Sequence, residues 1–224
     1  MNLDYPNFLL NLKTYDGTYG EDALAYAEEV EEVADETDAT FAVAPQATDL
    51  RLVAKNTSLS VVAQAADAAE PGRETGGILP EAVAEAGADG LMMNHPERRD
   101  TLADVETKIR RCEECGLDAI VCADSIEMGR AVLEYDPDCI IFENPDDIAS
   151  GNALARTRPE LVEEFVGIVA ERNPRTKVLL GGGITTADDV ARSFELGADA
   201  AGAASAAVLA DDRRGWLEAI AGAF

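Results

Sequence analysis

Three observations predict that this chain is an α/β protein, a (β/α)8 barrel. Short apolar runs alternate with longer amphipathic segments along the whole sequence, as in parallel strands joined by helices. Gly-X-Asp tripeptides that start at Gly87, Gly116 and Gly197 each end a helical segment and open an apolar run, because glycine accepts the left-handed conformation of a helix end. The 224 residues accommodate eight such strand–helix units, near the lower size limit of this barrel.

The apolar runs are the predicted strands. Pro45 stops the second run, since proline cannot donate to a sheet. In chain order, the predicted strands cover residues 8–10, 40–44, 59–63, 90–93, 118–122, 139–142, 177–180 and 200–203.

The predicted helices follow the strands and show apolar residues at helical spacing. Pro80 stands in a first turn, where its missing N–H costs nothing. The helices are expected at residues 20–37, 48–55, 80–87, 101–114, 125–133, 158–173, 185–196 and 213–221. Residues 64–77 form a long polar loop with Pro71, Gly72, Gly76 and Gly77.

No linker interrupts the series, so we expect a single barrel domain over residues 1–224. A doubly wound open sheet is the alternative fold. It would require a glycine-rich fingerprint directly after the first strand, and Asn11-Leu12-Lys13 is not one.

The composition excludes several classes of partner. There are 44 acidic and 18 basic residues, a net charge of −26, which argues against nucleic acid as a partner. No apolar run approaches the ~20 residues of a membrane span, and the N-terminal sequence lacks a signal-peptide pattern, so we expect a cytoplasmic protein that does not bind membranes. The acids are spread over every segment. We hypothesise adaptation to a highly saline cytoplasm, where salt screens their repulsion.

The cysteines do not indicate a metal site. Cys112 and Cys115 have a C-x-x-C spacing, but no second pair or nearby histidine completes a zinc site. Cys122 and Cys139 fall in apolar runs. We interpret all four as reduced thiols, mostly in the core.

Polar residues at the ends of separate strands predict an active site. In a barrel, the residues just past the carboxyl ends of the strands converge on one face. His95, the only histidine of the chain, follows the fourth strand. The other candidates are Asn11 and Lys13 after strand one, Glu143 after strand six, Gly181-Gly182-Gly183 after strand seven, and Ala204-Ser205 after strand eight.

These residues form a coherent acid–base set. Glu143 follows the apolar Ile140-Ile141-Phe142, which should raise its basicity by desolvation. Such a base can take a proton from a carbon next to a carbonyl, while His95 polarises that carbonyl and Lys13 stabilises the developing negative charge. Backbone N–H groups of the glycine run and of Ala204-Ser205 are suited to a phosphate.

The sequence resembles the triosephosphate isomerase family in its shorter archaeal form, along the length of the chain. Asn94-His95-Pro96-Glu97-Arg98-Arg99 is the most specific of the motifs that carry this resemblance. The others are Asn11-Leu12-Lys13, Val43-Ala44-Pro45-Gln46, Ala63-Gln64, Thr75-Gly76, Val121-Cys122-Ala123-Asp124, Phe142-Glu143-Asn144-Pro145, Ile148-Ala149-Ser150-Gly151 and Leu179-Leu180-Gly181-Gly182-Gly183.

The resemblance implies interconversion of dihydroxyacetone phosphate and glyceraldehyde 3-phosphate, in glycolysis and gluconeogenesis, with no cofactor and no metal. It makes Glu143 the catalytic base, His95 the electrophile, and Asn11 and Lys13 a catalytic pair that binds substrate. Residues 144–153 resemble a lid. The other implied roles are substrate binding for Ile148 at the tip of that lid, an acid behind the site for Glu97, and backbone phosphate binding for Gly183, Ala204 and Ser205.

The resemblance also implies an oligomer. The loop 64–77 is similar to the family's interdigitating loop, with Thr75 reaching a neighbouring active site. A homodimer or homotetramer is therefore expected.

Four residues depart from the family pattern: Pro96 replaces the usual Ser, and Asn144, Ala149 and Ser150 replace Pro, Gly and Thr in the lid. They bear on turnover and lid motion rather than on the type of reaction.

Two alternative functions stay open from the sequence. One is another phosphosugar isomerase or an aldolase; a Schiff-base aldolase would need a lysine inside the barrel, and Lys177 starts a strand. The other is a non-catalytic phosphate-binding barrel.

Overall fold

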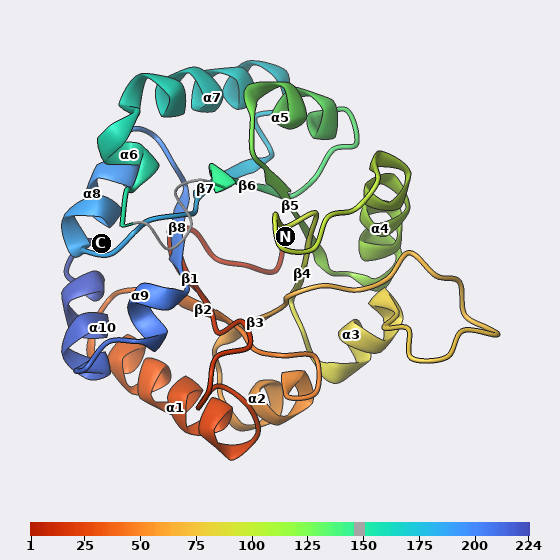
Figure 1. Ribbon diagram of the computed structural model, residues 1–224, viewed down its shortest axis with the longest axis horizontal. Coiled ribbons are helices and arrows are strands. Elements are labelled where there is room, and N and C mark those ends of the chain that lie inside the picture. The colour runs from red at the N-terminus through yellow and green to blue at the C-terminus, as the bar shows by residue number, and fades with distance from the viewer. Residues whose placement is uncertain (146–150) are drawn as a thin grey trace.

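The computed structural model describes residues 1–145 and 151–224. Within them, eight parallel strands close into a barrel in sequence order, β1 pairing with β8 (Figure 1). The predicted fold class is thus confirmed. The strands are β1 (Asn7–Asn11), β2 (Phe41–Ala44), β3 (Ser60–Ala63), β4 (Gly90–Met93), β5 (Asp118–Ala123), β6 (Cys139–Phe142), β7 (Lys177–Leu180) and β8 (Ala200–Ala203).

Helices surround the barrel (Figure 1). They are α1 (Glu21–Glu36), α2 (Leu50–Asn56), α3 (Pro80–Ala86), α4 (Leu102–Cys115), α5 (Ile126–Leu133), α6 (Leu154–Thr157), α7 (Pro159–Arg172), α8 (Ala187–Glu195), α9 (Ser205–Val208) and α10 (Arg213–Ala221). Capping boxes at Thr101 and Thr186 start α4 and α8, each with an Asp at the third helical position.

The short helices α6 and α9 were not predicted from the sequence. Each has only four residues. Such a length leaves too few apolar positions for a helical period to be recognised. The other elements agree with the predicted ranges within one or two residues.

Alternation along the strands divides the apolar residues into two cores. Leu9, Met92 and Ile141 belong to a cluster inside the barrel. Phe8 and Leu10, the neighbours of Leu9 in β1, belong to a larger cluster between the strands and the helices. The barrel interior is therefore a packed floor beneath the strand ends rather than an open pore.

Aspartates tie the strands together at their amino ends. Asp89, Asp138 and Asp199 accept hydrogen bonds of 2.8–2.9 Å from backbone N–H groups of β3, β5 and β7, respectively. These three residues directly precede β4, β6 and β8. The Gly-X-Asp pattern at residues 87–89 and 197–199 therefore ends a helix and also links two neighbouring strands.

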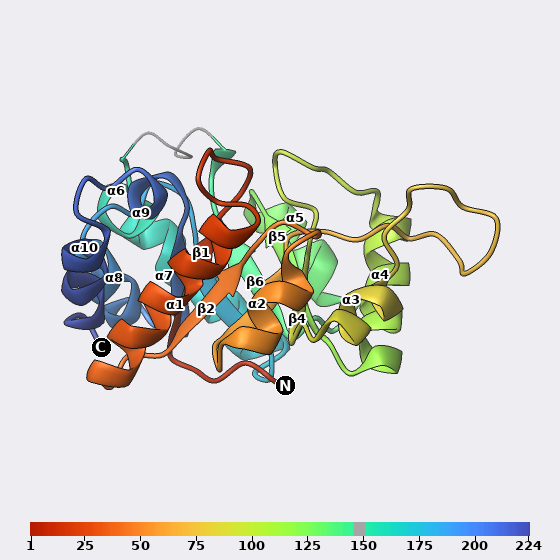
Figure 2. The same cartoon turned by 90° about the horizontal axis from the view of Figure 1, so that it is seen from below.

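The N-terminus lies beneath the barrel, at the end opposite the carboxyl ends of the strands (Figure 2). The buried carboxylate of Asp118 accepts hydrogen bonds from the backbone N–H groups of Asn2, at 2.8 Å, and Leu3, at 2.9 Å. The first residues of the chain are thus anchored to the start of β5.

The predicted loop after β3 projects beyond the ring of helices, in yellow and orange (Figures 1 and 2). Residues 70–77 are all exposed. At its base, Asp67 and Ile78 exchange hydrogen bonds, and Arg98 pairs with Asp67 at 2.8 Å. No helix of the described residues is long and apolar enough to cross a membrane.

The four cysteines are free thiols, as predicted. Cys112, Cys122 and Cys139 are buried and Cys115 is half-buried. Burial raises the pKa of the Cys112 and Cys139 thiols to about 12. Their packing, rather than reactivity, explains their presence.

Candidate active site

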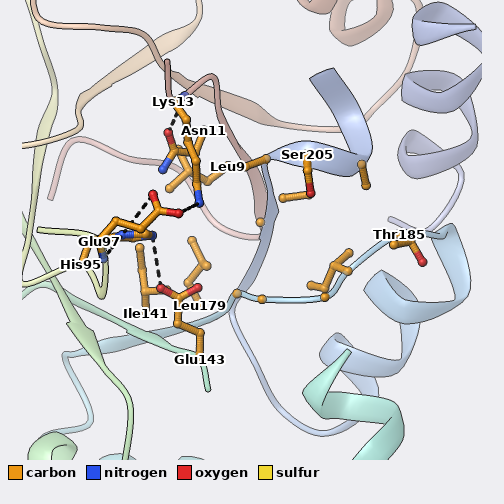
Figure 3. A pocket seen from close by; sticks show the side chains of 18 of the residues that line it. Leu9, Asn11, Lys13, His95, Glu97, Ile141, Glu143, Leu179, Thr185 and Ser205 are labelled. Atoms are coloured by element: carbon orange, nitrogen blue, oxygen red, sulfur yellow. Dashed lines mark hydrogen bonds and ion pairs between the residues drawn. The ribbon is translucent and has the colours of Figure 1, made fainter. Parts of the chain in front are cut away.

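The carboxyl ends of the strands surround a cavity of about 390 Å³. Every site residue predicted from the sequence and lying in the described part of the chain lines it. Figure 3 shows the side chains of Lys13, His95, Glu97 and Glu143 grouped on one side, with Ser205 on another. The predicted site residues that line the cavity are Asn11, Lys13, His95, Glu97, Glu143, Gly183, Ala204 and Ser205.

Lys13 is held in an unusual backbone conformation. Its φ of 47° lies in the left-handed region, which is uncommon for a residue with a side chain. Asn11 Oδ1 accepts a 2.9 Å hydrogen bond from the Lys13 N–H, and Gln64 Nε2 donates to the Lys13 carbonyl at 3.1 Å. These contacts stabilise a strained turn that directs the ammonium to Glu97 Oε1, 2.9 Å away.

His95 presents a neutral imidazole. The backbone N–H of Glu97 donates to its Nδ1 at 3.1 Å, so the ring proton is assigned to Nε2. Burial, and then the positive charge of Lys13, lower the pKa of His95 to about 4. A neutral Nε2–H that faces the cavity can donate a hydrogen bond to a carbonyl oxygen or an enediolate oxygen.

Glu143 is the buried acid of the cavity. Burial raises its pKa to about 7, although the nearby Lys13 ammonium opposes the shift. Oε1 lies 3.4 Å from His95 Nε2 and has no hydrogen-bond partner within the described residues. A buried carboxylate with an oxygen that accepts no hydrogen bond is poorly stabilised as an anion, which suits a general base that works near neutral pH.

The glycines at residues 181–183 leave space for the Glu143 side chain. A Cβ on Gly181 would lie 2.9 Å from Glu143 Oε2. Gly183 has a φ of 70°, and its Cβ would lie 2.5 Å from the carbonyl of Asn152. A side chain at Gly183 would therefore clash with backbone and one at Gly181 would displace the Glu143 carboxyl, and both glycines border the cavity.

Comparison with known proteins agrees with this geometry. The sequence profile of the family described as triosephosphate isomerase matches residues 6–223. The chain belongs to the triosephosphate isomerase family. The triosephosphate isomerase of Methanopyrus kandleri is 42% identical over 223 residues, covering 98% of this chain and 99% of the relative. That of Methanothermus fervidus is 38% identical, covering 96% and 97%.

A solved triosephosphate isomerase from Bartonella henselae has the same fold. Its TM-score is 0.76 at 18% identity, with 97% of this chain and 98% of that structure covered. At this identity the likeness concerns the fold alone.

The lid predicted at residues 144–153 lies partly outside the described residues. This applies to Ile148, the predicted tip, and to the departures at Ala149 and Ser150. Gly151, which follows them, lines the cavity.

The residues that line the cavity and that sequence reasoning missed include Tyr15, Thr185 and Leu209. Tyr15 follows Lys13 by two residues, and this nearness in sequence could have indicated that Tyr15 also lines the cavity. Leu209 is 65% exposed, an unusual exposure for leucine. Thr185 and Leu209 carried no recognisable signal, because they lie beyond the strand ends at distances that only the folded loops determine.

The described residues do not contain a group of three or more His, Cys, Asp and Glu side chains that could hold a metal ion. Lys13, His95, Glu97 and Glu143 supply the basic and acidic side chains that line the described part of the cavity.

Proposed function

We propose that this chain interconverts dihydroxyacetone phosphate and D-glyceraldehyde 3-phosphate by proton transfer through an enediolate, with Glu143 as the base. One observation carries the proposal: the unpartnered carboxylate oxygen of buried Glu143 lies 3.4 Å from the neutral His95 Nε2, in the cavity that Lys13 also lines. Membership of the triosephosphate isomerase family supports the choice of substrate.

The proposed cycle keeps every proton on the chain or the substrate. Glu143 removes a proton from the hydroxyl-bearing carbon next to the ketone, and His95 Nε2–H donates to the oxygens on which negative charge develops. The ammonium of Lys13 stabilises this charge. The proton of the substrate hydroxyl passes to the former ketone oxygen by way of His95 Nε2, which gives up one proton and takes back the other. Glu143 then returns its proton to the former ketone carbon, and the first carbon becomes the aldehyde.

The phosphate of the substrate is assigned to the opposite side of the cavity. Ser205 lies there (Figure 3), Gly183 and Ala204 also line the cavity, and the backbone N–H groups of these three residues suit a phosphate dianion. We assign Asn11 to substrate binding and to support of the Lys13 backbone, whose N–H donates to the Asn11 side chain.

A coupled assay that converts glyceraldehyde 3-phosphate to dihydroxyacetone phosphate, at high and low KCl, tests the proposal. Turnover should occur and should fall by at least roughly a thousandfold in Glu143→Gln, because general-base catalysis and its positioned proton transfer are both lost. Wild-type turnover in this variant would refute the role of Glu143. Binding of a phosphate analogue without turnover at any salt would favour the non-catalytic barrel instead.

A Schiff-base aldolase is disfavoured by the position of its candidate lysine. Lys177 starts β7, at the opposite end of the strand from the cavity, and pairs with Asp199 at 2.8 Å. Borohydride trapping with substrate should therefore label nothing.

The remaining assignments extend this proposal. We propose one catalytic domain over residues 1–224, acting in glycolysis and gluconeogenesis in the cytoplasm, with a surface adapted to high salt. We also propose a homodimer or homotetramer, supported by the exposed projecting loop at residues 70–77. Sedimentation at several KCl concentrations tests the oligomeric state.

A further inference from the structure

The turn that carries His95 is closed on itself at both ends. Asn94, which precedes His95, has a left-handed φ of 58° and is 2% exposed. Its backbone N–H donates to Asp100 Oδ2 at 2.8 Å, and the Asp100 N–H donates back to Asn94 Oδ1 at 3.2 Å. Residues 94–100 are thus a loop whose two ends hold each other, with His95 inside it.

The same two residues anchor the turn to neighbouring elements. Asn94 Nδ2 donates to the carbonyl of Cys122 in β5 at 3.0 Å. Lys108 of α4 places Nζ 2.6 Å from Asp100 Oδ1, and these two side chains are only 3% and 13% exposed. A buried ammonium requires a partner, so the ion pair fixes the distance between the turn and the helix.

These contacts lie outside the cavity. None of Asn94, Asp100 and Lys108 is among the described residues that line it. Within the turn, the Glu97 N–H orients the His95 ring through Nδ1. That bond fixes the ring relative to the turn, whereas the position of the turn relative to Glu143 depends on the anchors to β5 and α4.

We infer that Asn94, Asp100 and Lys108 are positioning residues that hold the His95 turn in the geometry needed for catalysis. The inference rests on the proposed role of His95 in the isomerisation. A left-handed asparagine persists where surrounding contacts over-determine it, and here its backbone N–H and both polar atoms of its amide are engaged.

Asn94→Gly is the first test. Glycine adopts a φ of 58° without strain, so the variant loses the amide contacts and keeps the turn conformation accessible. A displacement of about 1 Å at the reacting groups costs up to about 100-fold, so kcat should fall by roughly 10- to 100-fold. KM should change by less than about threefold, because the phosphate is held elsewhere.

The imidazole spectrum provides a readout that a merely structural role would not move. His95 is the only histidine, so the ¹⁵N signals of a labelled sample report this ring without assignment. In substrate-free Asn94→Gly these signals should shift or broaden. This measurement does not depend on turnover, so it separates failure of the positioning inference from failure of the proposed function.

Lys108→Met, with Lys177→Met as the matched control, is the second test. Both remove an ammonium paired with an aspartate, but the Lys177–Asp199 pair lies at the amino end of the barrel. Lys108→Met should lose the more stability, because the Lys177–Asp199 pair is about one-third exposed, and only Lys108→Met should alter kcat and the His95 signals. Wild-type kcat and His95 signals in Asn94→Gly, or the same changes in Lys177→Met, would overturn the inference; if Lys108→Met does not fold, Asn94→Gly decides.

Discussion

At the scale of single residues, Glu143 should set the pH dependence of catalysis. Its pKa of about 7 means that the free protein carries a competent base only above that pH. His95, with a pKa of about 4, stays neutral throughout this range. We predict that kcat/KM rises tenfold per pH unit below about pH 7 and then levels off.

Initial rates between about pH 5 and pH 9, followed by NMR of the substrate to avoid coupling enzymes, check this profile. The substrate phosphate itself ionises at about pH 6 and adds to the profile there, so the neutral histidine is checked separately, by a ¹⁵N titration of His95, and a midpoint at about pH 6 in that titration would contradict it. A flat profile would contradict the buried base.

Ionisation of the Glu143 carboxyl should lower the free energy of unfolding at alkaline pH. Because burial raises the pKa of Glu143 from 4.5 to about 7, the folded chain holds a proton that the unfolded chain has lost between these values. The contribution of the group is fully present below pH 4.5 and is lost as the pH rises through 7. The loss amounts to about 3 kcal/mol.

Glu143→Gln, which cannot ionise, should therefore gain stability relative to wild type as the pH rises from about 4.5 to 8. Urea unfolding at both pH values measures the difference in the free energy of unfolding between the variant and wild type. Glu163→Gln is the control, because Glu163 is exposed on α7 and keeps its hydration on folding. If that difference changed with pH by the same amount in Glu143→Gln and Glu163→Gln, burial of the Glu143 carboxyl would not be the cause.

At the scale of elements, α5 packs on α7 through a glycine. A Cβ on Gly129 would lie 2.2 Å from Cε2 of Phe165. Phe165 stacks on Phe142, with ring centroids 4.1 Å apart, and Phe142 directly precedes Glu143. This glycine therefore permits the close helix contact behind Glu143.

Gly129→Ala should destabilise the protein by about 1–3 kcal/mol, because the core must shift to admit the methyl group. The matched control is Gly167→Ala on α7, where a Cβ would meet nothing within 4 Å. It should stabilise by about 0.5–1 kcal/mol through helix propensity. Thermal unfolding of both variants decides, and a neutral Gly129→Ala would show that α5 and α7 can separate freely.

The strands, the long helices and the site were predictable from the sequence because each leaves a local signal. Continuous apolar runs marked the strands, and polar residues after β1, β4 and β6 marked the cavity. The left-handed turns at Lys13 and Asn94 left no such signal. They depend on partners elsewhere in the chain, Gln64 for Lys13 and Cys122 for Asn94.

At the scale of the whole molecule, the net charge of −26 should make stability depend on salt. Between about 0.1 M and 1 M salt the Debye length falls from about 10 Å to 3 Å, which screens repulsion between exposed acids. We predict that Tm rises steadily with KCl over this range. NaCl at equal ionic strength is the control for a specific effect of potassium, and a Tm independent of KCl would refute salt adaptation.

The anchored N-terminus beneath the barrel has a practical consequence. Asn2 and Leu3 are tied to Asp118 at the face opposite the cavity (Figure 2). An affinity tag extended from this end, and captured on a bead or an electrode, would leave the mouth of each barrel turned towards the bulk solution. The protein is thus suited to oriented immobilisation, with substrate reaching the cavity from the open side.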